Sequence, residues 1–254
     1  MKFFNISLIG LGLAATLFPS LVRAEAQSDI AHLPASLQPV PRTEASHRAR
    51  HEAFNAQARE GGFEVLFIGD SITQGWEKEG KTAWDAHIAP LRAANFGISG
   101  DRTEHVLWRL ENGNLEGKIN PKAIVLMIGT NNTGHRSDKP DDICAGVVAI
   151  VKKLTQRFPE AKLLVLAIFP RGEKPNAAAR LNNEAANAAI ASAFADKNTW
   201  KNVKTLDLSS VFLESDGTLS PAVMPDFLHL SEAGYDRWAE ALVPELKQML
   251  GQQP

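Results

Sequence analysis

Cysteine is nearly absent from this chain of 254 residues, which contains only Cys144. A single cysteine excludes an internal disulfide and a cysteine-rich metal site. Because Cys144 lies in the apolar run 143–148, we expect a buried and inert thiol at this position.

An excess of charge of either sign is also missing. The chain has 27 lysines and arginines against 29 aspartates and glutamates, which gives a formal net charge of −2. This balance gives no electrostatic footprint for nucleic acid or for an anionic membrane surface, so we expect neither as a partner. With 44% hydrophobic and 22% charged residues, the composition is typical of an ordinary globular protein of one domain.

Long apolar runs are absent except at the N-terminus. There Lys2 precedes an apolar run over residues 6–21, and Val22-Arg23-Ala24 places small residues at the −3 and −1 positions of a signal peptidase site. Cleavage after Ala26 is an alternative. The pattern predicts a signal peptide over residues 1–24 and an exported mature chain. An uncleaved anchor helix is the other interpretation, but the run is short for a membrane span, so we expect no transmembrane anchor.

Three prolines in residues 25–46 predict an extended lead-in before the domain, which spans residues 47–254. The domain starts with a helix over residues 47–60. His47 and His51, four residues apart on that helix, could bind a metal ion. Since no third ligand is near and arginines flank them, we predict a solvated helix face instead.

Strand and helix patterns alternate along the rest of the chain, without internal repeats or low-complexity segments. Short apolar runs predict strands, and longer amphipathic segments predict helices. This alternation favours a doubly wound α/β fold, with a parallel sheet covered on both faces. The predicted strands are 63–68, 93–98, 123–128, 163–169 and 203–208, and the predicted helices between and after them are 82–91, 103–111, 141–157, 177–195 and 232–250.

The first of these strands ends in Gly69-Asp70-Ser71 and turns into a helix. This places the Ser71 hydroxyl at the carboxyl edge of the sheet, where ligands bind in open parallel α/β folds. Backbone N–H groups in the first turn of a helix have no intrahelical partners and can face a developing negative charge. The turn is therefore suited to a nucleophile, although an ordinary N-cap would give the same local pattern.

Three further segments carry polar groups to the same edge of the predicted sheet. Gly100 follows the second strand and can bring a bare backbone N–H close to a ligand. Asn131 follows the third strand and offers a side-chain amide. Asp226 and His229 precede the last helix, and a histidine oriented by a carboxylate is the usual partner of a catalytic serine.

These segments together resemble the four conserved blocks of the SGNH, or GDSL, hydrolase superfamily. Further stretches resemble the catalytic subunits of the brain-type platelet-activating-factor acetylhydrolase branch. They are Asn95-Phe96-Gly97-Ile98, residues 105–110, residues 170–176 and residues 226–230. The resemblance covers nearly the whole domain. It implies a flavodoxin-like three-layer α/β/α sandwich with a five-stranded parallel sheet.

The resemblance also implies a role for each matching residue. Ser71 would be the nucleophile, His229 the general base and then acid, and Asp226 the carboxylate that orients His229. The oxyanion hole would consist of the backbone N–H groups of Ser71 and Gly100 and the side-chain amide of Asn131. No metal or organic cofactor is implied. We expect Asp70 to hold the turn through backbone hydrogen bonds.

Other side chains near these segments have two interpretations. Trp76 and Trp108 could line an acyl pocket, but packing in the core is as frequent for tryptophan. Arg102 and Arg171 could bind an anionic group of a substrate, and we favour loop-bracing or surface roles for both. His135 could reach the rim of the site.

The sequence thus predicts an exported serine esterase that hydrolyses short-chain esters, with acetyl suggested by the branch and a carbohydrate or glycan substrate suggested by export. A phospholipid or lysophospholipid acylhydrolase is one alternative, and an inactive relative that binds acylated glycans is another. The oligomeric state stays open. Asn131-Asn132-Thr133 is the only N-glycosylation acceptor in the mature chain, and a glycan there would block the site. This favours a bacterial origin, with export to the periplasm or the medium.

Overall fold

The computed structural model of the chain describes residues 33–253, and those from Ala35 onward belong to one compact unit. The predicted signal peptide and the first part of the lead-in lie outside the described residues. Within the described residues, no helix combines the length and the hydropathy that crossing a membrane requires. The domain boundaries set out above stay predictions.

A parallel sheet of five strands forms the centre of this unit, in the order β2-β1-β3-β4-β5. All pairings are parallel, and Gly97, Gly69 and Met127 lie side by side where the neighbouring strands β2, β1 and β3 end. The loops that follow therefore leave the sheet at one edge. The strands are β1 (Val65–Gly69), β2 (Ala93–Gly97), β3 (Ala123–Met127), β4 (Lys162–Leu166) and β5 (Val203–Leu206).

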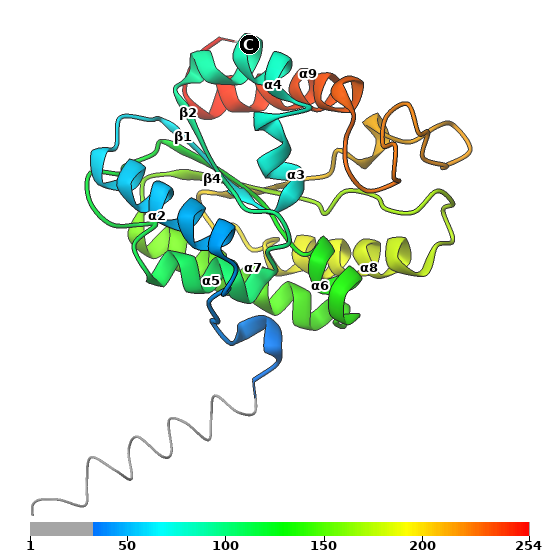
Figure 1. The fold of residues 1–254 in the computed structure, drawn as a ribbon, viewed down its shortest axis with the longest axis horizontal. Coiled ribbons are helices and arrows are strands. Elements are labelled where there is room, and N and C mark those ends of the chain that lie inside the picture. The colour runs from blue at the N-terminus through cyan, green and yellow to red at the C-terminus, as the bar shows by residue number, and fades with distance from the viewer. Residues whose placement is uncertain (1–32, 254) are drawn as a thin grey trace, which may run out of the picture. The chain divides into compact units, whose positions relative to one another are not determined.

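Helices cover both faces of the sheet, which confirms the predicted three-layer architecture (Figure 1). Every residue of β1 and β3 is buried, as expected for strands that are covered on two sides. Side chains alternate between the faces, so Ile124 and Leu126 pack in one core while Val125 packs in the other. One face carries α2 (Ala45–Glu60), α5 (Thr103–Glu111), α7 (Pro140–Arg157) and α8 (Ala178–Ala193), and the other carries α3 (Ser71–Gln74), α4 (Lys81–Ala83) and α9 (Glu232–Met249).

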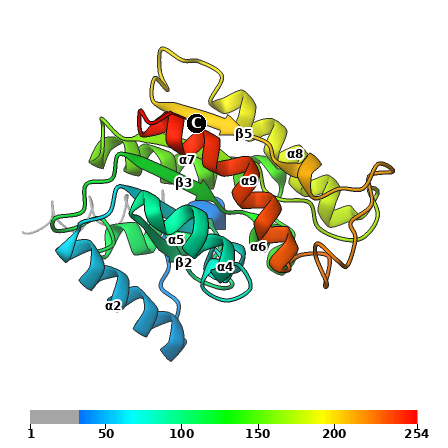
Figure 2. The ribbon, with the colours of Figure 1, turned by 90° about the horizontal axis from the view of Figure 1, so that it is seen from above.

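The long helices begin where their sequences supply start signals. Pro140 opens α7, and two aspartates follow in its first turn, where negative charge is favourable. Ser231 caps α9 by accepting a hydrogen bond from the Gly234 N–H at 3.2 Å. Helix α9 lies across one face of the sheet (Figure 2), and its buried apolar side chains belong to the core that contains Val125, called the second core below. The predicted bounds of α5 match those of the structure, and those of α7, α8 and α9 differ by one or two residues.

One predicted helix is wrong, and one helix of the structure was missed. The helix predicted over residues 82–91 consists of α4, a π-helical turn η3 (Trp84–Ile88) and a 3-10 turn η4 (Ala89–Leu91). Pro90 lacks a backbone N–H, so a regular helix cannot continue through it. The short helix α6 (Thr130–Arg136) was not predicted at all, because its sequence of threonine, asparagine, glycine and histidine has neither apolar periodicity nor high helix propensity.

The lead-in is only partly extended. A 3-10 turn η1 (Ala35–Leu37) contacts α5 and α7, and the Thr103 hydroxyl donates a hydrogen bond to the Ser36 carbonyl at 3.0 Å. Helix α2 begins at Ala45, two residues before the predicted start. The described end of the lead-in therefore packs against the domain.

The predicted solvated face of the first helix is also wrong. His47 and His51 are only 3% and 4% exposed. His47 Nε2 lies 2.9 Å from a carboxylate oxygen of Asp101, and the ring of His51 lies beside Asn55. These buried partners compensate for the desolvation of the imidazole rings. In the described part of the chain, no three histidine, cysteine or acidic side chains are grouped to hold a metal ion.

Cys144 is half-buried rather than fully buried. Burial, and next to it the charge of Asp141, raises the pKa of its thiol. The thiol form, which is the unreactive one, is therefore favoured as expected.

Candidate active site

Three side chains from the two ends of the domain form a hydrogen-bonded series. Ser71 is the first residue of α3, directly after β1, and its Oγ lies 2.9 Å from His229 Nε2. His229 Nδ1 in turn lies 2.7 Å from Asp226 Oδ2. Ser71 and His229 are 158 residues apart in the sequence, and the sheet edge brings them together.

The short loop before α9 fixes the carboxylate and the imidazole relative to each other. Asp226 Oδ1 accepts hydrogen bonds from the backbone N–H groups of Leu228, at 3.1 Å, and of His229, at 2.7 Å. Phe227 between them has a left-handed backbone with φ of 56°. The side chains of His229 and Asp226 remain 46% and 56% exposed, so the series is open to substrate and water.

The charge state of Asp226 suits a role beside an imidazole. Although desolvation raises its pKa, the hydrogen bonds from the ring and the backbone of His229 hold the pKa of Asp226 below its usual value. The ionised carboxylate accepts a hydrogen bond from the N–H at His229 Nδ1, which leaves Nε2 free to accept a hydrogen bond from the Ser71 hydroxyl. This arrangement can move a proton from a serine to a histidine and stabilise the imidazolium that results.

Asp70 holds the turn that presents Ser71, as predicted. It is 1% exposed, and its Oδ1 accepts a hydrogen bond from the Ile72 N–H at 3.0 Å. Burial, against the effect of this hydrogen bond, raises the pKa of the Asp70 carboxyl to about 7. The group is a cap of α3 rather than part of the proton path.

Gly100 follows β2 and Asn131 follows β3, the two strands that flank β1. A hydrogen bond joins Asn131 to Asp101, the residue directly after Gly100. Gly100 has a φ of 78° in the turn after β2, and a side chain there would meet the Arg42 guanidinium. Asn131 is the second residue of α6, after β3, and is buried. Its Nδ2 donates a hydrogen bond to the carbonyl of Asp101 at 2.9 Å, which uses one of the two amide hydrogens.

A buried ionic cluster supports this turn and was not found from the sequence. Asp101 is fully buried and pairs with Arg109 Nε at 2.8 Å as well as with His47. Arg109 also donates to the Phe96 carbonyl at 3.1 Å and to Asn114 at 2.8 Å. The only sequence signal for the cluster is that Asp101 follows Gly100 directly.

Three of the five side chains with two interpretations prove structural. Trp76 is 0% exposed and packs between Tyr235 and Trp238 in the second core, so it does not close an acyl pocket. Trp108 lies beside the ring of His51. Arg171 donates to the Thr130 carbonyl at 2.7 Å and thereby braces α6.

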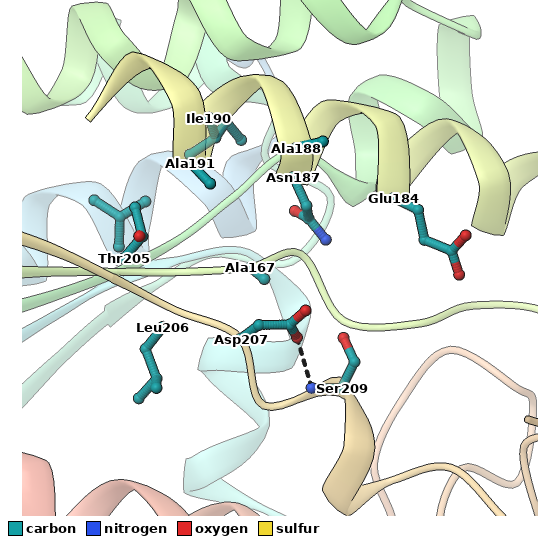
Figure 3. Close-up of a pocket in the computed structure, with 11 residues that line it drawn as sticks. Ala167, Glu184, Asn187, Ala188, Ile190, Ala191, Thr205, Leu206, Asp207 and Ser209 are labelled. Atoms are coloured by element: carbon teal, nitrogen blue, oxygen red, sulfur yellow. Dashed lines mark hydrogen bonds between the residues drawn. The ribbon is translucent and has the colours of Figure 1, made fainter. Parts of the chain in front are cut away.

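Two cavities are candidate sites for a chemical reaction. One of about 650 Å³ contains Ser71, Asp226 and His229 and extends along Gln74, Glu77 and Glu79. Another of about 420 Å³ lies between β5 and α8 and is lined by Asn187, Ile190 and Leu206 among others (Figure 3). The second contains none of the predicted site residues, and its one drawn hydrogen bond is a local turn at Asp207. The first is the candidate active site.

Comparison with known proteins agrees with this geometry. Residues 67–237 match the sequence profile of the GDSL-like lipase/acylhydrolase family. The chain is 41% identical over 205 residues to the platelet-activating factor acetylhydrolase IB subunit alpha1 of Homo sapiens, a match that covers 80% of this chain and 83% of that protein. It is 39% identical over 206 residues to the alpha2 subunit of Rattus norvegicus, covering 81% and 86%.

The chain belongs to the GDSL-like lipase/acylhydrolase family. It is an ester hydrolase, and the predicted resemblance is confirmed. The fold of this acylhydrolase is shared with a GDSL-like lipase from Bacteroides thetaiotaomicron, with a TM-score of 0.62 at 18% identity over 81% of this chain and 99% of that one. It is also shared with an acetylxylan esterase from Geobacillus stearothermophilus, with a TM-score of 0.58 at 22% identity over 73% and 94%.

Proposed function

We propose that this acylhydrolase is an exported serine esterase that removes short acyl groups, foremost acetyl, from carbohydrate or glycan esters. The observation that carries the proposal is the hydrogen-bonded series Ser71–His229–Asp226 at the end of β1. The roles assigned below follow from that geometry and from the chemistry of serine hydrolases.

In the first half of the reaction, His229 Nε2 takes the proton from the Ser71 hydroxyl while Oγ bonds to the acyl carbon. The carbonyl oxygen becomes an oxyanion, and the backbone N–H groups of Ser71 and Gly100 and the free amide hydrogen of Asn131 stabilise it. The tetrahedral intermediate then collapses. The bond to the alcohol oxygen breaks, and His229 gives its proton to that oxygen as the alcohol leaves.

The second half repeats these steps with water. His229 removes a proton from the water, which attacks the acyl carbon of the acyl-enzyme, and Ser71 leaves with that proton. Asp226 keeps the imidazole oriented and compensates its charge in both halves. The products are the free acid and the regenerated serine, and every proton passes through His229.

The proposed acyl group and alcohol rest on three supports. The similar proteins include acetylhydrolases and an acetylxylan esterase by name. Polar and charged side chains, among them those of Gln74, Glu77 and Lys78, line the cavity beside Ser71 together with Pro225, Leu230 and Tyr235. The exposed large hydrophobic side chains of the described chain are Leu33, Val40 and Leu181, and none of them lines this cavity. A lipid substrate would favour an apolar surface there.

An ester series decides between the short-acyl and the lipase alternatives. A closed pocket rejects longer chains by overlap, whereas an open apolar groove gains about 0.8 kcal/mol for each buried CH₂ group. We therefore expect kcat/KM to fall from p-nitrophenyl acetate through butyrate to octanoate. An increase toward octanoate would replace the acetylesterase proposal with the lipase alternative.

Labelling with a fluorophosphonate probe tests the proposed nucleophile in the same preparation. Ser71→Ala should lose both labelling and turnover while its circular dichroism spectrum stays unchanged, and Ser192→Ala, an exposed serine on α8, is the matched control. Retained activity in Ser71→Ala would contradict the mechanism. A native protein that binds acetylated xylan but releases no acetate from any ester would support the inactive binding relative instead.

Export is the remaining part of the proposal and rests on the sequence of residues 1–24. Expression of the full chain in a bacterial host should give a secreted or periplasmic protein whose first residue is Glu25 or Gln27. N-terminal sequencing of that protein checks the site. Recovery of the whole protein with an intact N-terminus in the cytoplasmic fraction would contradict export.

A further inference from the structure

A separate polar cavity of about 410 Å³ lies on the other side of the turn after β2. The cavity that contains Ser71 also touches Ser99, and this second cavity touches Gly100, the next residue along the chain. The two cavities therefore meet the proposed oxyanion loop at consecutive positions. The second is lined by Pro41, Arg42, Thr43 and Glu44 of the lead-in, by Gly100, by Arg102 and His105 at the start of α5, and by His135 of α6.

Basic side chains dominate this lining. The Arg42 guanidinium, 20% exposed, donates to the Ser99 carbonyl at 2.7 Å and to Glu44 at 2.7 Å. The Arg102 guanidinium, 23% exposed, uses its Nε for the buried Glu104. Glu44 is the only carboxylate that lines the cavity, and its side chain is 52% exposed, so it can turn outward at little cost.

His105 adds a buried donor that has no acceptor among the described residues. Its Nδ1 accepts the backbone N–H of Arg102 at 3.0 Å. Burial, against the pull of Asp101 and Glu104, lowers the pKa of His105 to about 4, so the ring is neutral at pH 7. A neutral imidazole whose Nδ1 accepts must carry its hydrogen on Nε2.

The Nε2–H of His105 therefore meets another donor rather than an acceptor. Arg102 Nη2 lies 3.3 Å from this nitrogen, and a guanidinium has only donors. His105 is 6% exposed, so solvation by bulk water does not compensate. Arg102 and His105 thus place two N–H donors together at the wall of this cavity. Two such donors can bind an oxygen that carries negative charge.

His135, which also lines this cavity, is affected by the positive charge of the arginines. Burial lowers the pKa of His135, and the charges of three arginines lower it further. These are Arg102, Arg42 and Arg171. The part of this shift that comes from the arginines reflects a positive potential, and a positive potential favours an anion.

We propose that this second cavity, built around Arg102 and His105, binds a carboxylate of the substrate, so that the preferred substrates are acyl esters of sugar acids. The inference rests on the proposed esterase function and deepens it by naming the substrate class. The carboxylate accepts from Arg102 and His105 Nε2–H and displaces Glu44 from Arg42. The ester then reacts at Ser71, in the cavity that adjoins the same turn at Ser99.

A matched pair of substrates tests the inference. Mono-O-acetylated glucuronic acid and mono-O-acetylated glucose differ only in the carboxylate, and acetate release is measured for both. We expect kcat/KM to favour the glucuronate by about tenfold, the size of one charge-assisted hydrogen bond. Free glucuronate should inhibit the hydrolysis of p-nitrophenyl acetate competitively, and glucose should not.

Two variants should change this preference in opposite directions, and a third serves as the control. Arg102→Gln should reduce the glucuronate preference to about one, since it removes a charged donor. Glu44→Gln should increase the preference, because it removes the anion that competes for Arg42, and a damaged fold would not give that result. Arg48→Gln, an exposed arginine on α2 outside the cavity, is the charge-matched control and should leave the preference unchanged.

The outcomes separate this inference from the proposed function. Equal rates for both acetylated sugars, without inhibition by glucuronate, would overturn the carboxylate site while p-nitrophenyl acetate hydrolysis still supported the esterase. An increased preference in Arg102→Gln would overturn it as well. If the native protein hydrolysed no ester and took no fluorophosphonate label, the proposed function itself would fail.

Discussion

At the scale of single residues, the side-chain amide of Asn131 is held in place by one hydrogen bond and offers another. Its bond to the Asp101 carbonyl at 2.9 Å orients the group, and the second amide hydrogen would serve the proposed oxyanion hole. We predict that Asn131→Ala lowers kcat by about 10² to 10³ with little change in KM, because the donor acts on the transition state. Steady-state kinetics with p-nitrophenyl acetate measure this.

The control for Asn131→Ala is Asn198→Ala, an exposed asparagine far along the chain, which should keep native kinetics. A thermal melt of both variants separates lost catalysis from lost stability. A change confined to KM would show that Asn131 binds the ground state instead.

Asp70 gives the protein a pH-dependent stability. Burial raises its pKa to about 7 in the folded state, whereas an aspartate in an unfolded chain has a pKa of about 3.9. Between these values the folded protein keeps a proton that the unfolded chain releases. The contribution of Asp70 to stability is thus fully present below about pH 4 and is lost as the pH rises toward 7, by at most about 1.4 kcal/mol per pH unit.

We predict that Asp70→Asn removes this dependence, since the asparagine oxygen can still accept from Ile72 and carries no charge. The stability of the variant relative to the native protein should rise as the pH increases from 4.5 to 6.5. Urea unfolding at three pH values measures it. Parallel stability profiles would show that the Asp70 carboxyl is ionised in the folded protein throughout this range.

The sequence was informative about the polar residues at the strand ends and uninformative about what supports them. Ser71, Asp226 and His229 stand in motifs with fixed spacing, and the structure brings these three together. The burial of His47 was missed because its partner, Asp101, lies 54 residues away. Local sequence cannot reveal a carboxylate that comes from a distant turn, here the one after β2.

At the scale of elements, the helix that carries Ser71 is only four residues long and depends on α9 for its position. The Tyr235 hydroxyl of α9 donates to the Ile72 carbonyl at 2.7 Å. Gly75 and Gly80 leave room for this tyrosine, since a side chain at either would overlap its ring or hydroxyl. The phenol is buried, and its desolvation raises its pKa, so it remains a donor.

Removal of that hydroxyl should therefore affect both stability and turnover. We predict that Tyr235→Phe lowers the free energy of unfolding by about 1–3 kcal/mol, the cost of leaving a buried carbonyl without its donor. It should lower kcat more than KM, because Ser71 loses a fixed position. Urea unfolding and steady-state kinetics check the two effects, and native kcat in a destabilised variant would limit Tyr235 to a structural role.

The elements found from the sequence are those whose signals are local. The periodicity of residues 141–157 predicts α7 almost completely, because one face of a 3.6-residue helix must be apolar. Helix α6 has no such signal, and its position follows from Arg171, which braces it from another loop. The break within residues 82–91 comes from Pro90, which lacks a backbone N–H, and the apolar periodicity of the segment does not record it.

At the scale of the whole molecule, the sheet separates two cores that share no side chain. Ile150 of α7 packs on one face and Ile88 on the other, and both are 0% exposed. We predict that Ile150→Val and Ile88→Val each cost about 0.5–1.5 kcal/mol of stability. The double variant should lose the sum within about 0.5 kcal/mol, because the sites have no common partners.

Urea unfolding of the two single variants and the double variant measures this additivity. A single transition in each should persist, since the strands belong to both cores. A double variant that differs clearly from the sum would mean that the sheet transmits strain between its faces.

The 158-residue separation between Ser71 and His229 also determines at which stage of folding the candidate active site forms. A nascent chain or a refolding intermediate that has formed β1 through β5 still lacks its base until α9 docks against α3. Contacts between distant parts of a chain close late, because loop-closure entropy opposes them. The recovery of esterase activity during refolding should therefore report this final docking step.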